Sequence, residues 1–211
     1  MKDLLILDFD GVVLKADELF YQIAKDNFFI NRSDRYPISK VRMSEVISTG
    51  GEKLFKAVIG RENFTKDDVN IFRKAQVDCF NKENHLFSVL SDIENIYNDY
   101  KNGICICSNK PDWIIKEILI KSDMSKFIDG VYGLDGPYKR KPSPDHILHA
   151  VKKHSSRVDK VDFVGDSNVD WLAAKNSGCN FIFAEYGYGP KPATLPKGVK
   201  TISLFSDLCK N

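Results

Sequence analysis

Four short aliphatic runs recur along this sequence, and long segments with helical spacing separate them. The first run, Leu4 to Leu7, has charged residues on both sides, which is typical of a strand buried on both faces of a parallel sheet. The other three occupy residues 104–107, 161–164 and 181–184, and a last short strand is expected near 201–202. Strands that alternate with helices form βαβ units, so the pattern predicts an α/β fold with a three-layer α/β/α arrangement.

The segment from Asp10 to about Phe87 departs from this alternation. It shows helical periodicity and no convincing buried strand, and its apolar stripes are interrupted by Pro37, the pair at 50–51 and Gly60. We therefore predict two domains. Residues 1–13 and 88–211 are expected to form a Rossmann-like core with a parallel sheet, and residues 14–87 an α-helical cap subdomain inserted after the first strand.

Composition excludes several classes of protein. The 31 basic and 29 acidic residues leave a formal charge of +2, which is too balanced to indicate a nucleic-acid or membrane-surface protein on bulk electrostatics. No stretch approaches the roughly 20 apolar residues of a membrane span. The 5 cysteines lack zinc-site spacing and are expected to be free thiols. We expect a cytoplasmic monomer or homodimer that binds neither nucleic acid nor membrane.

Two aspartates, Asp8 and Asp10, follow the first predicted strand and flank a single residue. In open α/β sheets, ligands bind in the crevice outside the carboxyl ends of the strands. One carboxylate there can bind a divalent cation and attack as a nucleophile, while the other holds or releases a proton. The alternative is a capped turn, because Asp and Gly are common turn residues.

A second pair of aspartates, Asp166 and Asp170, follows the run at 161–164. Carboxylates from two strand ends brought together would make a Mg²⁺ site, because Mg²⁺ prefers hard oxygen ligands. The alternative is that Asp166 and Ser167 cap the next helix. The magnesium interpretation is favoured because this pair and the first pair are predicted at the same edge of one sheet.

Two further segments would complete a phosphate site. Ser108 and Asn109 close the run at 104–107, where a hydroxyl and the N–H groups that open a helix can bind phosphate oxygens. Lys141 precedes another helix and offers a compact positive charge for a nucleophilic carboxylate and a phosphoryl group. A solvated loop is the alternative for Lys141, and its neighbours Lys139 and Arg140 are expected to be exposed.

Taken in order, these four segments closely resemble the motifs of the haloacid dehalogenase superfamily of phosphohydrolases. Residues 8–12 match its first motif, Ser108 its second, Lys141 its third, and residues 165–170 its fourth. The helical insertion after the first motif looks like the first-position cap of that family. The stretch from Gly165 to Gly178 is similar to the phosphoglycolate phosphatase-like branch.

The resemblance implies that Asp8 is a nucleophile that forms an aspartyl-phosphate. It also implies that Asp10 is the general acid and then the general base for the attacking water. Asp8, the backbone carbonyl of Asp10 and Asp166 would hold Mg²⁺. Dehalogenases of the superfamily lack the second aspartate of the first motif, so Asp10 favours a phosphatase or phosphomutase.

The same resemblance assigns the remaining motif residues. Ser108 would donate a hydrogen bond to the phosphoryl oxygens, Lys141 would offset their charge, and Asp170 would support the metal or Lys141. Substrate choice should lie in the inserted subdomain. There Lys53, or Arg42, is expected to meet an anionic part of the substrate, although a surface lysine is the alternative for Lys53.

The sequence therefore predicts a Mg²⁺-dependent phosphohydrolase that acts on a small phosphorylated metabolite, of which phosphoglycolate is one candidate. Two alternatives stay open. One is a phosphomutase that resembles β-phosphoglucomutase and uses the same nucleophile, Asp8. The other is a non-catalytic protein that binds phosphorylated metabolites, against which the complete motif set argues.

Overall fold

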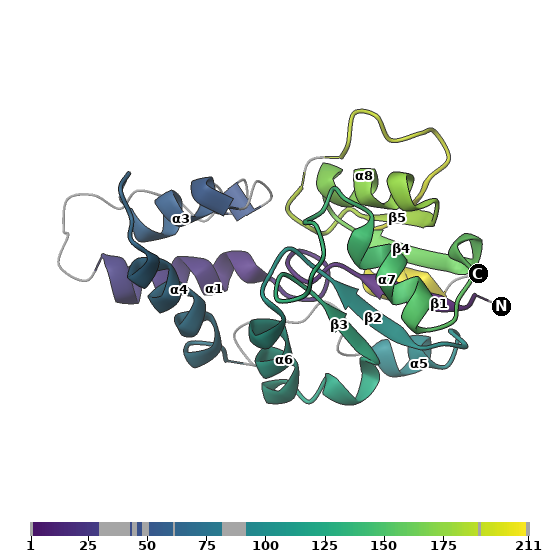
Figure 1. Cartoon of the computed structure of the whole chain (residues 1–211), viewed down its shortest axis with the longest axis horizontal. Helices are drawn as coiled ribbons and strands as arrows, with labels where there is room; N and C mark the ends of the chain where they lie inside the picture. Colours follow the sequence, from purple (N-terminus) through teal and green to yellow (C-terminus); the bar gives the residue numbers. More distant parts are fainter. Residues whose placement is uncertain are drawn as a thin grey trace. The chain divides into compact units, whose positions relative to one another are not determined.

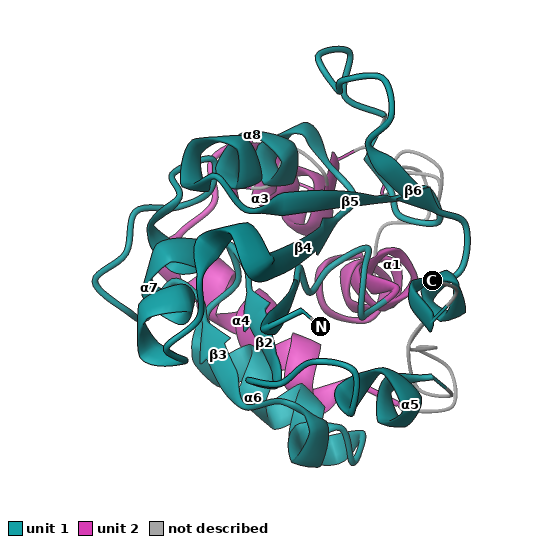
Figure 2. Cartoon of the chain, turned by 90° about the vertical axis from the view of Figure 1, so that its right-hand side faces the viewer, with its two compact units in different colours: residues 1–14, 87–211 teal, residues 15–86 magenta. Residues whose placement is uncertain are grey.

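A computed structural model describes residues 2–29, 43, 46–47, 51–60, 62–81, 92–189 and 191–209 of the chain. The chain divides into two compact units, residues 1–14 with 87–211 and residues 15–86, which are coloured separately in Figure 2. The second boundary of the predicted insertion, at residues 87 and 88, lies outside the described residues.

The first unit is built on one sheet of parallel strands in the order β3-β2-β1-β4-β5-β6 (Figure 1). The strands are β1 (Leu4–Leu7), β2 (Ile104–Cys107), β3 (Gly130–Tyr132), β4 (Val161–Gly165), β5 (Asn180–Ala184) and β6 (Lys200–Ile202). The predicted α/β fold with a parallel sheet is confirmed. β3 was not predicted, because its three residues form no apolar run.

Helices cover both faces of this sheet. They are α5 (Ile93–Tyr97), α6 (Asp112–Lys121), α7 (Asp145–Lys153) and α8 (Asn168–Ser177), with short helical turns η2 (Ser125–Phe127), η3 (Val158–Lys160) and η4 (Phe205–Cys209). Figure 2 shows α7 and α8 on one side of the sheet and α5 and α6 on the other. No helix in the described part of the chain combines the length and the apolarity needed to cross a membrane.

The core of the first unit follows from the alternation of side chains along each strand. All four residues of β1 are buried, so the sheet is covered on both sides. Leu4 and Ile6 face α7 and α8, in one cluster with Phe163 of β4 and with Ile147 of α7. This packing fixes the position of the carboxyl end of β1, where the first predicted motif begins.

All the regular secondary structure in the described residues of the second unit is helical. Its elements are α1 (Ala16–Ile23), the π-helical turn η1 (Ala24–Phe28), α3 (Gly51–Ile59) and α4 (Lys66–Asp78). Phe72 of α4 packs edge-on against Phe20 and Phe55, with ring centroids 5.0 and 6.0 Å away. Thr65 and Asp68 form a reciprocal capping box that starts α4.

Candidate active site

The predicted motif residues meet at the carboxyl edge of the sheet, around the central strand β1. Asp8 directly follows β1, which pairs with β2 on one side and β4 on the other. Ser108 follows β2 and Asp166 follows β4. The chain runs from β1 to β2 and β3 on one side of the sheet and returns to β4 on the other. Asp8 therefore lies where the strand order reverses, the usual ligand site of such sheets.

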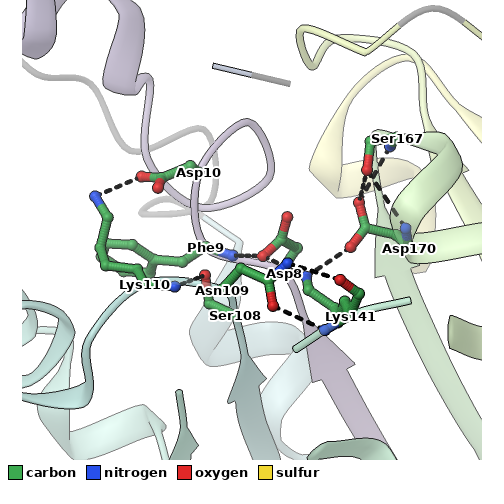
Figure 3. Close-up of polar contacts among 9 residues, drawn as sticks. All are labelled: Asp8, Phe9, Asp10, Ser108, Asn109, Lys110, Lys141, Ser167 and Asp170. Carbon is green, nitrogen blue, oxygen red and sulfur yellow. Dashed lines mark hydrogen bonds and ion pairs between the residues drawn. The ribbon is translucent and has the colours of Figure 1, made fainter. Parts of the chain in front are cut away.

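Lys141 forms ion pairs with two carboxylates of this group (Figure 3). Its Nζ lies 2.8 Å from Oδ1 of Asp8 and 2.6 Å from Oδ1 of Asp170. Only 2% of the Lys141 side chain is exposed, so all its charge compensation comes from within the protein. Burial opposes the charged form of Lys141, but Asp170 and Asp8 outweigh it and raise its pKa above the usual range. Lys141 is therefore a permanent cation beside Asp8, whereas Lys139 and Arg140 are exposed, as expected.

The start of α8 holds Asp170 in place. Ser167 is the N-cap residue of α8, and it forms a reciprocal capping box with Asp170. Oδ2 of Asp170 accepts hydrogen bonds from the backbone N–H and the hydroxyl of Ser167, while Oδ1 binds Lys141. Because both carboxylate oxygens are engaged, the geometry favours a role for Asp170 in positioning Lys141 over direct metal ligation.

Asn109 fixes the backbone of Lys141 from the other side. Its Oδ1 accepts a hydrogen bond of 2.8 Å from the backbone N–H of Lys141, and its Nδ2 donates one of 3.0 Å to the carbonyl of Lys141. The side-chain amide predicted to bind substrate is therefore engaged by the chain itself. Ser108, next to it, is buried, and its Oγ accepts a 3.3 Å hydrogen bond from the N–H of Lys110, which leaves the hydroxyl proton to be donated.

Lys110 is a site residue that the sequence reasoning missed. Its Nζ lies 2.8 Å from Oδ1 of Asp10, and its side chain is 4% exposed. In Figure 3 the Asp10 carboxyl group points toward Lys110 and away from the Asp8 carboxylate. The only signal in the sequence was the position of Lys110 directly after Ser108 and Asn109, which does not identify a partner about a hundred residues away.

Replacing Lys110 with Met is expected to lower the free energy of unfolding by about 1–2 kcal/mol, because it removes the ion pair of a largely buried Asp10 carboxylate. A double-mutant cycle with Asp10→Asn, followed by urea denaturation, should give a coupling energy of about 1 kcal/mol. The exposed Lys116→Met variant is the matched control. Additive effects of the Lys110 and Asp10 substitutions would show that the ion pair does not contribute to stability.

Three carboxylates lie close together at this edge, and two of them have an oxygen that a cation could bind. Oxygens of Asp8, Asp166 and Asp170 all lie within 4.8 Å of one another. Among the described residues, neither Oδ2 of Asp8 nor Oδ1 of Asp166 has a hydrogen-bond partner, so each is available as a ligand. The donor set consists of hard oxygens that suit Mg²⁺. The side chain of Asp10 is not part of this group, which leaves only its backbone carbonyl as the predicted ligand.

The electrostatics of the site also fit a bound cation. Burial and the nearby charge of Asp170 raise the pKa of Asp8 to about 8, although Lys141 lowers it. Burial and Asp170 likewise raise the pKa of Asp166 to about 7. One lysine thus does not balance three buried carboxylates, and a divalent cation would supply the missing positive charge.

The two predicted substrate-binding residues of the insertion lie apart from these motifs in the sequence. Lys53 is an exposed residue of α3 in the second unit. Arg42 lies outside the described residues. Both residues therefore stay predictions.

Comparisons with known proteins show what the chain is similar to. A family model described as haloacid dehalogenase-like hydrolase matches residues 5–184. A phosphoglycolate phosphatase from Vibrio parahaemolyticus is 24% identical over 163 residues, which cover 72% of each chain. A putative pyrophosphatase, PpaX, from Caldanaerobacter subterraneus is 25% identical over 189 residues, covering 88% of this chain and 82% of the relative. The crystal structure of a predicted phosphoglycolate phosphatase from Haemophilus somnus superposes with a TM-score of 0.79 at 19% identity, covering 99% and 97% of the two chains.

Proposed function

Because the chain belongs to the haloacid dehalogenase-like hydrolase family and is a phosphoric monoester hydrolase, we propose a Mg²⁺-dependent phosphatase that uses Asp8 as its nucleophile. The observation that carries the proposal is the grouping of Asp8, Asp166 and Lys141 at the end of the central strand. It combines an oxygen nucleophile, ligands for a cation and a buried positive charge. The substrate is a small phosphorylated metabolite, in line with the phosphoglycolate phosphatases among its relatives.

In the first step, an oxygen of Asp8 attacks the phosphorus of the substrate. A bond forms between this oxygen and phosphorus, and the bond from phosphorus to the leaving-group oxygen breaks. Oδ1 of Asp8 is held by the N–H of Phe9 at 2.7 Å and by Lys141, which fixes the direction of the carboxylate. The product of this step is an aspartyl-phosphate and an alcohol whose proton comes from Asp10.

In the second step, Asp10 accepts a proton from water as the water oxygen attacks the phosphorus. The bond between phosphorus and Asp8 breaks, which releases inorganic phosphate, restores the carboxylate of Asp8 and leaves Asp10 protonated for the next cycle. Lys110, paired with Asp10 at 2.8 Å, orients the carboxyl group between these two proton transfers.

The other motif residues position the reacting groups. Lys141 neutralises negative charge on the phosphoryl group during its transfer. Asp170 holds the side chain of Lys141, and Asn109 holds its backbone. The hydroxyl of Ser108 donates a hydrogen bond to a phosphoryl oxygen. Asn109 is thus assigned to positioning instead of the predicted contact with substrate.

Asp8, Asp166 and the backbone carbonyl of Asp10 would hold the magnesium ion. When bound, the ion reduces the repulsion between the anionic nucleophile and the anionic phosphate, and it favours the ionised forms of Asp8 and Asp166. The helical unit of residues 15–86 is proposed to act as the cap that selects the substrate, with Lys53 as a candidate contact for an anionic group.

The test is release of inorganic phosphate from a panel of phosphoglycolate, sugar phosphates, nucleotides, pyrophosphate and an aryl phosphate. Each substrate is assayed with MgCl₂ and with EDTA. Mg²⁺-dependent release from at least one monoester is expected, and its rates rank the substrates. Pyrophosphate is included because of the putative pyrophosphatase among the relatives. An excess of isomerised sugar phosphate over free phosphate would identify a mutase, and no reaction by the folded protein would contradict the proposal.

A further inference from the structure

The loop that follows β5 returns to the site and binds Asp166. The backbone N–H of Tyr188 donates to Oδ2 of Asp166 at 2.7 Å, and that of Gly189 donates to the same oxygen at 3.2 Å. Two donors on Oδ2 fix the rotation of the carboxylate and leave Oδ1 for a cation. None of the four predicted motifs includes this loop, which lies about twenty residues beyond Asp166.

Glycines let this loop approach Asp166 closely. A Cβ on Gly187 would lie 2.2 Å from Cβ and 2.5 Å from Oδ2 of Asp166, and a Cβ on Gly189 would lie 2.1 Å from its carbonyl oxygen. Neither glycine has a positive φ, so the requirement is one of space and not of backbone conformation. A Cβ on Gly11, in the first motif, would lie 2.2 Å from Oδ2 of Asp166. Gly11 and Gly187 therefore leave room for the carboxylate of Asp166, and Gly189 leaves room for its backbone.

Two tyrosine hydroxyl groups fasten the loop to the first motif. The hydroxyl of Tyr186 donates to the carbonyl of Val12, and that of Tyr188 donates to the carbonyl of Leu14, both at 3.3 Å. Burial, together with the charge of Asp166, raises the pKa of Tyr186 above its usual range, which keeps its hydroxyl protonated as a donor. The loop thus spans from Asp166 to the segment that directly follows Asp8 and Asp10.

We propose that residues 186–189 are the positioning element of the cation site: Tyr188 and Gly189 orient Asp166 as a ligand, Gly187 provides the space, and the two tyrosine hydroxyls hold the loop. None of these residues touches the reacting atoms, so they are positioning residues. The inference rests on the proposed function, in which Asp166 binds Mg²⁺.

The test measures Mg²⁺ binding directly, by isothermal titration calorimetry of the full chain with MgCl₂. Gly187→Ala pushes a methyl group against the Asp166 carboxylate and is expected to weaken Mg²⁺ binding about tenfold or more. Ala193→Ser is the matched control. Ala193 is exposed in the same C-terminal part of the chain, so one added side-chain atom there is expected to leave Mg²⁺ binding as in the wild type. Circular dichroism checks that each variant is folded.

A second variant isolates the hydroxyl contacts. Tyr188→Phe keeps both N–H donors but removes the hydrogen bond to Leu14, and about a threefold weakening of Mg²⁺ binding is expected. Raising the MgCl₂ concentration should restore the kcat of both variants, which a general loss of folding would not allow.

The outcomes separate the two proposals. No Mg²⁺ binding by the wild type would overturn the metal requirement of the proposed function, and this inference with it. Wild-type affinity in folded Gly187→Ala would overturn the inference alone. If Gly187→Ala does not fold, Tyr188→Phe decides, and wild-type affinity in that variant would overturn the inference.

Discussion

Replacing Asp8 with Asn is expected to reduce phosphate release by at least about 10⁴-fold. The amide keeps the shape of the side chain but carries no negative charge, so it cannot form the aspartyl-phosphate. It also weakens the cation site, because an amide oxygen is a poorer ligand than a carboxylate. Since Asp8 lies among buried acidic groups, the substitution removes one negative charge from an acidic cluster, and the variant should fold.

The loss is measured with the best substrate of the panel at saturating MgCl₂. Asp159→Asn is the matched control, because Asp159 is exposed. Within the described residues, its carboxylate forms an ion pair only with Arg157, which is also exposed. It should retain wild-type activity. Residual activity of Asp8→Asn above a few per cent of the wild type would exclude Asp8 as the nucleophile.

Replacing Lys141 with Met is expected to lower kcat by about 10²–10³-fold, because the charge that offsets the phosphoryl oxygens is lost. It should also lower the free energy of unfolding by roughly 3 kcal/mol in EDTA. Lys141 is the cation between Asp8 and Asp170, and its removal leaves two buried carboxylates facing each other. Protonation of one of them is the expected response of the protein.

Urea denaturation in EDTA and steady-state kinetics measure the two effects. Lys139→Met is the control, since Lys139 is exposed two residues away and its described contact to Asp145 uses only the backbone N–H. A Lys141→Met variant with wild-type kcat would remove Lys141 from the proposed mechanism. One that is as stable as the wild type would show that the ion pairs do not stabilise the fold.

The sheet could be predicted largely from the sequence, because a strand buried on both faces requires an uninterrupted apolar run. Leu4 to Leu7 and the runs at 104–107, 161–164 and 181–184 meet that requirement. β3 does not, because Gly130 and Val131 are only half-buried at an edge of the sheet. An edge strand of three residues is specified by its neighbour β2 and leaves little trace in hydrophobicity.

The motif residues Asp8, Lys141 and Asp166 could be placed together for a topological reason. Each follows a strand or precedes a helix, and all such junctions of a parallel sheet meet at one edge. The contacts of Lys110 and Tyr188 could not be predicted in this way. The partner of Lys110 is set by the turn after β1, and Tyr188 acts through its backbone N–H, which every residue except proline carries.

The central place of β1 has a consequence for biosynthesis. Leu5 pairs with Ile104 on one side and with Asp162 on the other, so β1 is synthesised before both of its neighbours. Pairings this distant along the chain are slow to form, and unpaired strand edges are prone to aggregate. In a nascent chain that ends before β4, the edge of β1 that pairs with β4 has no partner strand. The order of synthesis therefore leaves β1, which leads to Asp8, without one of its partner strands until β4 has been made.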